Sequence, residues 1–184
     1  MTRKTFFYLI FFQGICLTLL CLPACKNRKG NQSDTHVQTA AELRQKASGL
    51  LKEFVDGALS RNGYTRDSIR LSEPAVVSYI YGRNAFTPAW SDSMHWLPVG
   101  DSLYHFILEA KFFGLFPEDY HISELRPIRE KMETDTLFRD ERKDAALWAR
   151  ADILLTDAFL RIIKDIKLGR LPNDIITLLR DSVQ

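Results

Sequence analysis

Residues 139–167 read RDERKDAALWARADILLTDAFLRIIKDIK and decide the fold class of this chain. Their apolar side chains recur three or four positions apart, which places them on one face of an α-helix: Trp148, Ala151, Leu155, Ala158, Phe159, Ile162 and Ile166. Asp157 and Arg161 are four residues apart and are expected to pair on the wetter side. Gly169 is typical of a helix end. We therefore predict a helix from about Arg139 to Lys167 that buries this face against the first and third helices.

Two further helices are indicated upstream. Thr39 and Glu42 form a T-x-x-E capping box, in which each side chain accepts a hydrogen bond from the other residue's backbone N–H. Apolar residues follow at helical spacing until Asn62-Gly63 predicts the end of the helix. After Ser72, Pro74 favours the first turn of a shorter helix. The β-branched residues in this segment leave a strand as a competing interpretation: Val76, Val77 and Ile80.

The third and fourth helices are expected after residue 100. Asp101 is a suitable N-cap for a helix that ends at Gly114. Ser123 is a suitable cap for the next helix, with Pro127 near its fourth position, where a missing N–H costs little. No convincing alternating strand is present, so the sequence predicts an all-α, irregular helical domain.

The loop between Asn84 and Pro98 is rich in aromatic residues. Phe86, Trp90 and Trp96 are its candidates for stacking on a sugar or a peptide. An aromatic cluster in a helical domain is more often a plug over the core, and we favour that interpretation.

The first 25 residues resemble a bacterial lipoprotein signal. Arg3 and Lys4 precede a largely apolar run that extends to Leu22, and Leu22-Pro23-Ala24-Cys25 resembles a lipobox. The run is marginal for crossing about 30 Å of hydrocarbon, which favours an export signal over a spanning helix. We predict Cys25 as the lipidation site, with a non-lipidated export signal or a short membrane anchor as the alternatives.

Signal processing would remove or modify every thiol of the chain. The three cysteines are Cys16, Cys21 and Cys25, so no disulfide, Cys-ligated metal or cysteine nucleophile is expected downstream. Arg3 and Lys4 account for the formal net charge of +2, so the processed chain has no basic excess for nucleic acid. The expected organisation is a signal peptide at 1–24, a lipidated cysteine and flexible tether at 25–36, and a helical domain at 37–184.

Catalytic, cofactor-binding and metal-binding residues are not predicted anywhere in the chain. The four histidines have no partner at ligand spacing: His36, His95, His105 and His121. Glu118 and Asp119 are adjacent and cannot face each other as an acid–base pair. Asp152 and Asp157 lie among apolar residues of the long helix, and one of them is expected to be partly buried and tied to another segment. A structural role is favoured over catalysis for both.

Four stretches, in order, resemble the scaffold domain of large multi-domain L,D-transpeptidases. They are YGRNAFTPAW at Tyr81–Trp90, EAKFFGLFPEDYH at Glu109–His121, ADILLTDAFL at Ala151–Leu160 and GRLP at Gly169–Pro172. The resemblance implies a periplasmic, cell-wall context and a non-catalytic helical scaffold that carries other modules. It agrees with the lipoprotein signal, which was identified independently.

The catalytic domain of that family uses a cysteine nucleophile in an S-x-G-C motif with a histidine base, and this chain contains no such motif. We therefore expect no enzymatic activity and interpret the chain as a truncated or fragmentary member, incomplete at its C-terminus. The expected partners are a membrane, through the lipid on Cys25, and peptidoglycan or a downstream catalytic domain. Two alternatives remain: a chain that acts once a separate catalytic chain completes it, and a stand-alone helical lipoprotein that binds an envelope protein or glycan.

Overall fold

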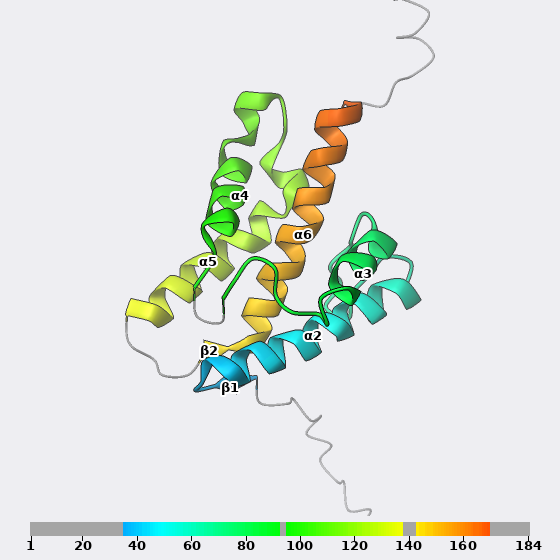
Figure 1. Ribbon diagram of the computed structural model, residues 1–184. Coiled ribbons are helices and arrows are strands. Elements are labelled where there is room, and N and C mark those ends of the chain that lie inside the picture. Colours follow the sequence, from blue (N-terminus) through cyan, green and yellow to red (C-terminus); the bar gives the residue numbers. More distant parts are fainter. Residues whose placement is uncertain (1–34, 93–94, 138–142, 170–184) are drawn as a thin grey trace, which may run out of the picture. The chain divides into compact units, whose positions relative to one another are not determined.

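The computed structural model describes residues 35–92, 95–137 and 143–169, omitting the side chains of 135–137, and all of these residues belong to one compact unit (Figure 1). The predicted signal peptide, Cys25, most of the tether and the residues after Gly169 lie outside the described part of the chain. None of the described helices is long and apolar enough to span a bilayer.

The described residues are mainly α-helical, which confirms the predicted fold class. The elements, in chain order, are β1 (His36–Val37), α2 (Ala40–Ser60), α3 (Pro74–Gly82), α4 (Pro98–Glu109), the 3₁₀ turns η2 (Ala110–Phe113) and η3 (Pro117–Tyr120), α5 (Ile122–Leu137), β2 (Lys143–Asp144) and α6 (Ala145–Leu168). The small antiparallel pair of β1 and β2 was not expected. It places His36 opposite Asp144, so His36 is in a strand and not in a tether.

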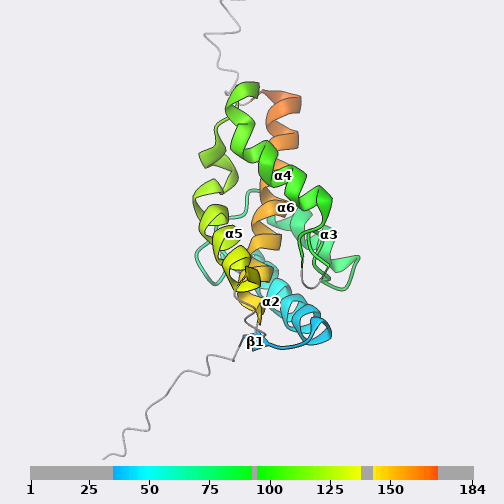
Figure 2. The same cartoon turned by 90° about the vertical axis from the view of Figure 1, so that its left-hand side faces the viewer.

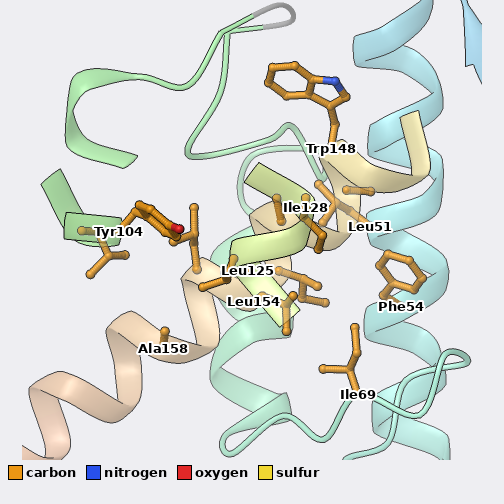
Figure 3. Close-up of a cluster of buried hydrophobic side chains, with 14 of the residues drawn as sticks. Leu51, Phe54, Ile69, Tyr104, Leu125, Ile128, Trp148, Leu154 and Ala158 are labelled. Carbon is orange, nitrogen blue, oxygen red and sulfur yellow. The ribbon is translucent and has the colours of Figure 1, made fainter. Parts of the chain in front are cut away.

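Helix α6 is the central element, as predicted. Helix α2 packs along it over the largest helix–helix contact, and Figure 1 shows α4 and α5 on one side of α6 with α3 on the other. Figure 2, seen from that first side, shows α4 and α5 in front of α6. The core therefore surrounds α6, and Figure 3 shows side chains from α2, α4 and α5 converging on it.

Helix α2 forms as its sequence predicts. The Thr39 hydroxyl oxygen accepts a hydrogen bond from the Glu42 N–H at 3.2 Å, and the Glu42 carboxylate accepts one from the Thr39 N–H at 3.2 Å. The backbone N–H groups of Thr39 and Gln38, which donate to the Glu42 carboxylate, lower the pKa of Glu42. The helix buries Leu43, Ala47, Leu51, Phe54, Val55 and Ala58, and Asn62 and Gly63 follow its end with φ angles of 52° and 92°.

Three predicted helix starts were wrong, each because a better local start exists. Helix α4 begins at Pro98, whose fixed φ suits a first turn, so Asp101 lies inside the helix and binds Arg129 instead of capping. Helix α5 begins at Ile122, so Ser123 is its second residue and Pro127 lies deeper than the expected fourth position.

The start of α6 also differs from the expected Arg139. Lys143 and Asp144 are extended in β2, and the Asp144 carboxylate accepts a hydrogen bond from the Ala146 N–H at 3.0 Å. Asp144 is therefore the N-cap, and the helix begins at Ala145. Residues 139–142 of the predicted helix lie outside the described part of the chain.

The apolar face of α6 is only partly buried. Trp148, Ala151, Leu155, Ala158 and Ile162 are buried as predicted, but Phe159 is 41% exposed and Ile166 is 64% exposed. The predicted helical spacing is therefore correct, but Phe159 and Ile166 lie at the exposed edge of the face. Segment 74–82 is a helix and not a strand; it buries Val77 and Tyr81 and exposes Val76 and Ile80.

Candidate functional site

The most distinctive chemical feature of the described chain is a set of three buried polar residues on α6: Asp152, Thr156 and Asp157. We call these residues and the side chains that bind them the polar row. Asp152 begins it and is only 2% exposed. Its Oδ1 accepts hydrogen bonds from the Tyr81 hydroxyl at 2.5 Å and from the Ala89 N–H at 3.0 Å. Its Oδ2 accepts one from the Trp90 N–H at 2.9 Å. One carboxylate therefore fixes both the end of α3 and the start of the aromatic loop.

Thr156 lies one helical turn further along and shares these partners. Its hydroxyl oxygen lies 2.7 Å from the Tyr81 hydroxyl and accepts a hydrogen bond from the Trp90 indole N–H at 2.8 Å. Both the backbone and the side chain of Trp90 are thus bound to the same face of α6.

Asp157 is fully buried and binds two other segments. Its Oδ1 accepts hydrogen bonds from the Ser72 N–H at 2.6 Å and from the Ser72 hydroxyl at 2.8 Å, and its Oδ2 lies 2.8 Å from His121 Nε2. The predicted exposed pair of Asp157 with Arg161 was wrong, because Ser72 and His121 enclose the carboxylate. One of the two aspartates was expected to tie another segment to the helix, and the structure shows that both Asp152 and Asp157 do so.

Burial sets the electrostatics of this row. Loss of solvent raises the pKa of Asp152, and the hydrogen bonds from Ala89, Tyr81 and Trp90 oppose that rise. Burial also raises the pKa of Tyr81 well above its usual value, and the neighbouring Asp152 charge adds to the effect. Tyr81 is therefore held as a neutral hydroxyl that donates to the carboxylate.

The chemistry available to this row is structural. Among the described residues, no fully buried side-chain nitrogen or oxygen lacks a hydrogen-bond partner. The carboxylates of Asp152 and Asp157 accept hydrogen bonds from protein donors on other segments. The row therefore positions segments of the chain.

The other candidate residues are dispersed. His105 Nδ1 lies 2.8 Å from its own helix at the Asp101 carbonyl, and His95 is exposed beside Asp92. Of the four histidines only His121 joins the polar row. Within the described ranges, no three histidine, cysteine or carboxylate side chains gather as metal ligands. Glu118 and Asp119 lie together in the short turn η3.

The aromatic loop acts as a plug over the core, the interpretation favoured from sequence. Phe86, Trp90 and Trp96 are partly buried against it. The Trp90 ring lies edge-on to Phe159 with 5.6 Å between centroids, and Trp96 lies edge-on to Tyr104 at 5.7 Å.

Comparison with known proteins gives one informative match. A family model described as Scaffold domain matches residues 75–181, more than half of the chain. The chain belongs to the Scaffold domain family. No curated protein and no solved structure was found to match it. Helix α2 precedes the matched Scaffold region, although it makes the largest contact with α6.

The polar row lies almost wholly within the Scaffold region. Tyr81 and Trp90 come from the first quoted sequence stretch, His121 from the second, and Asp152, Thr156 and Asp157 from the third. These stretches and both aspartates could be identified from the sequence, but the hydrogen-bond partners of the aspartates could not. The contacts join residues 36 to 85 positions apart, which spacing rules cannot match.

Proposed function

We propose that this Scaffold-family chain is the non-catalytic scaffold region of an L,D-transpeptidase-like lipoprotein that takes part in peptidoglycan remodelling. The observation that carries the proposal is the polar row, because its side chains come from three of the four stretches that resemble the transpeptidase scaffold. Those residues hold segments on α6. A scaffold needs this kind of rigidity to fix the positions of attached modules.

The proposed location is the periplasmic side of a bacterial membrane, with the chain anchored by a lipid on Cys25. The support is the order of the positive start, the apolar run and Leu22-Pro23-Ala24-Cys25. Mass spectrometry of the chain expressed in a bacterial host should find Cys25 acylated at the new N-terminus. Cys25→Ala should leave the membrane fraction. A wild-type chain recovered soluble with a free Cys25 would contradict the anchor.

The absence of activity is tested with the processed chain. A carbapenem reacts covalently with the thiolate of an L,D-transpeptidase, so the processed chain, which would have no free thiol, should gain no mass. It should also exchange no D-amino acid into muropeptides. A covalent adduct on any residue would overturn the non-catalytic assignment.

The scaffold role itself needs a partner carrying the S-x-G-C motif. Affinity capture of the tagged chain from its own envelope should recover a protein with this motif, or the genomic sequence downstream should encode one. Asp152→Ala should lose the partner, whereas Asp56→Ala, at an exposed position on α2, should retain it. Recovery of muropeptides or an unrelated envelope protein by both variants would favour a stand-alone binding lipoprotein.

A further inference from the structure

Three exposed phenylalanines lie close together in the chain where α4 is followed by the 3₁₀ turns. Phe112 is 75% exposed, Phe113 is 62% exposed and Phe116 is 52% exposed. Phe113 stacks on Phe106 of α4 with 5.0 Å between ring centroids, which fixes the direction of its ring. We call Phe112, Phe113 and Phe116 the phenylalanine surface. Single exposed apolar residues are ordinary on protein surfaces, but a group of large ones marks an interaction site.

The last turns of α6 lie beside this surface. The Tyr120 hydroxyl at the end of η3 donates a hydrogen bond to Asp165 Oδ2 at 2.8 Å, and η3 packs on α6. Leu168, three residues after Asp165, is on the same side of the helix and is 61% exposed. Figures 1 and 2 both show the end of α4, where η2 begins, at the same end of the molecule as the end of α6. The chain therefore leaves α6 close to the phenylalanine surface.

The sequence that follows α6 has the pattern of an amphipathic helix. Gly169 has a φ of 82°, in the region that favours glycine, so α6 ends there. Residues 170–184 lie outside the described part of the chain and read RLPNDIITLLRDSVQ. Asn173 is a suitable N-cap. Most of the apolar residues that follow fall at helical spacing and predict one apolar stripe: Ile175, Leu178, Leu179 and Val183.

The family match places this segment in the same domain as the surface. The Scaffold model matches residues 75–181, which include both the phenylalanine surface and most of the segment. An amphipathic helix is stable only when its apolar stripe is buried against another element. The segment starts beside an exposed apolar surface, and the short connection after Gly169 keeps the effective concentration of the segment at that surface high.

A second exposed apolar surface is also within reach of the segment. Ile163 and Ile166 lie about 100° or more around α6 from Asp165 and therefore face away from η3. They belong to a single convex helix. A helix placed on the phenylalanine surface instead contacts two elements, η2 and the end of α6, and so buries more of its stripe. The phenylalanine surface is the better site on this ground.

A membrane is a further surface that exposed phenylalanines could contact, and the position of the proposed lipid anchor disfavours it. The Thr35 carbonyl is bound to the Ala145 N–H at the start of α6. The phenylalanine surface is at the other end of that helix, about 36 Å away for 24 residues. The ten residues 26–35 that follow Cys25 span about 33–36 Å when fully extended. The surface would therefore reach the bilayer that holds Cys25 only at the limit of the tether.

We propose that residues 173–184 form an amphipathic helix that docks on the phenylalanine surface and on Leu168. Leu178 and Leu179, in the middle of the stripe, contact the phenylalanine rings. The proposal rests on the family match and on the exposed residues of η2 and α6, and it does not depend on the transpeptidase-like function.

Photo-crosslinking in cells that express the full chain tests the contact directly. The photoreactive residue p-benzoylphenylalanine replaces Leu178, and after irradiation the digested chain is analysed by mass spectrometry. The probe should join the segment to the peptide that contains Phe112, Phe113 and Phe116. The matched control is the same probe at Thr177, which lies on the opposite side of the predicted helix and should not give this product.

The products of the cross-link distinguish the other occupants. A covalent species of twice the mass of the chain would assign the surface to a second copy and overturn the proposal. A product with the peptide that contains Ile163 and Ile166 would place the segment on the other face of α6 and would also overturn it. The same products from the probes at Leu178 and Thr177 would show that the segment does not dock.

Thermal unfolding of the full chain gives an independent test. Phe112→Ser and Leu178→Ser should each lower the melting temperature by about 3–6 °C, because each removes part of one buried contact. The double substitution should lower it little more than the larger single effect, because the two residues share that contact. Val99→Ser, at a 56% exposed position on α4, is the control and should change nothing.

Two outcomes of the unfolding test would overturn the proposal: no effect of Phe112→Ser, or fully additive effects of Phe112→Ser and Leu178→Ser. Either failure would leave the transpeptidase-like function untouched, because the carbapenem and partner tests of that function do not involve this surface.

Discussion

The two halves of one face of α6 lie in opposite surroundings. Asp152, Thr156, Phe159, Ile163 and Ile166 are spaced four, three, four and three residues apart and therefore share this face. In the first half, the polar Asp152 and Thr156 are buried. In the second half, the apolar Ile163 and Ile166 are 46% and 64% exposed. Phe159 lies at the boundary, edge-on to Trp90.

This difference shows that a side chain on this face is buried where another segment covers it and supplies its hydrogen-bond partners. The polarity of the side chain alone does not decide its burial. The aromatic loop covers the first half and brings the donors that a buried carboxylate needs. Beyond Trp90 no described element covers the face, and an exposed apolar side chain has only a small cost. Stability should therefore depend strongly on the polar half of the face and weakly on the apolar half.

The largest expected effect is from Asp152→Ala. The substitution leaves the Ala89 and Trp90 N–H groups without their acceptor, and the Tyr81 hydroxyl keeps only Thr156 as a partner. Leaving buried donors unpaired should cost about 3 kcal/mol or more of the free energy of unfolding, measured by urea denaturation. Asp56→Ala, which breaks an exposed pair with Lys52, should cost less than about 1 kcal/mol. Equal losses would contradict the importance of the polar half.

A comparison of Leu155→Ala with Phe159→Ala tests whether the buried part of α6 ends at Phe159. Leu155 is fully buried, and its truncation should cost about 2–5 kcal/mol through lost contacts and a cavity. Phe159 is partly exposed and has one aromatic contact, so its truncation should cost only about 1–2 kcal/mol. A larger loss from Phe159→Ala, in the same thermal or urea measurement, would show that another part of the chain covers this face.

The pH dependence of stability should have opposite signs for Glu42 and Asp152. The pKa of Glu42 is lowered on folding from 4.5, so its stabilisation is present above that value and is lost as the pH falls through the folded pKa. The pKa of Asp152 is raised from 3.8, so its contribution is most favourable below that value and declines as the pH rises through the folded pKa. Wild type should therefore exceed Glu42→Gln in melting temperature at pH 7, and the difference should vanish in acid. A difference that grows on acidification would contradict the capping-box assignment.

The smallest expected effect is from Ile166→Ser at the exposed end of the face. The side chain is 64% exposed, so the free energy of unfolding should change by no more than about 0.5 kcal/mol. Thermal unfolding of the purified chain gives the measurement. Thr156→Val, at the buried end of the face, is the matched control and should lower the melting temperature clearly, because the Trp90 indole loses its acceptor.

Local signals predicted the helices well and their ends less well. The capping box at Thr39 and the spacing on α6 identified the two helices that pack most extensively. The starts of α4 and α5 were misplaced because Asp101 and Ser123 are good caps in isolation, while Pro98 and the left-handed His121 provided earlier starts.

Partners in the polar row could not be predicted in the same way. The sequence indicated that one of Asp152 and Asp157 would be tied to another segment, but helix periodicity says nothing about a partner on another element. Tyr81 is 71 residues from Asp152 and Ser72 is 85 residues from Asp157. Only the folded chain brings them together.

The short pairing of β1 with β2 has a mechanical consequence. His36 lies opposite Asp144, and the Thr35 carbonyl accepts a hydrogen bond from the Ala145 N–H at 3.0 Å. The start of β1 and the end of β2 are at the same end of this antiparallel ladder. Tension between the N-terminal side of the chain and the far end of α6 would therefore load the hydrogen bonds between β1 and β2 one after another and not all at once. The pair of β1 and β2 would separate at low force, and the helices around α6 would stay folded.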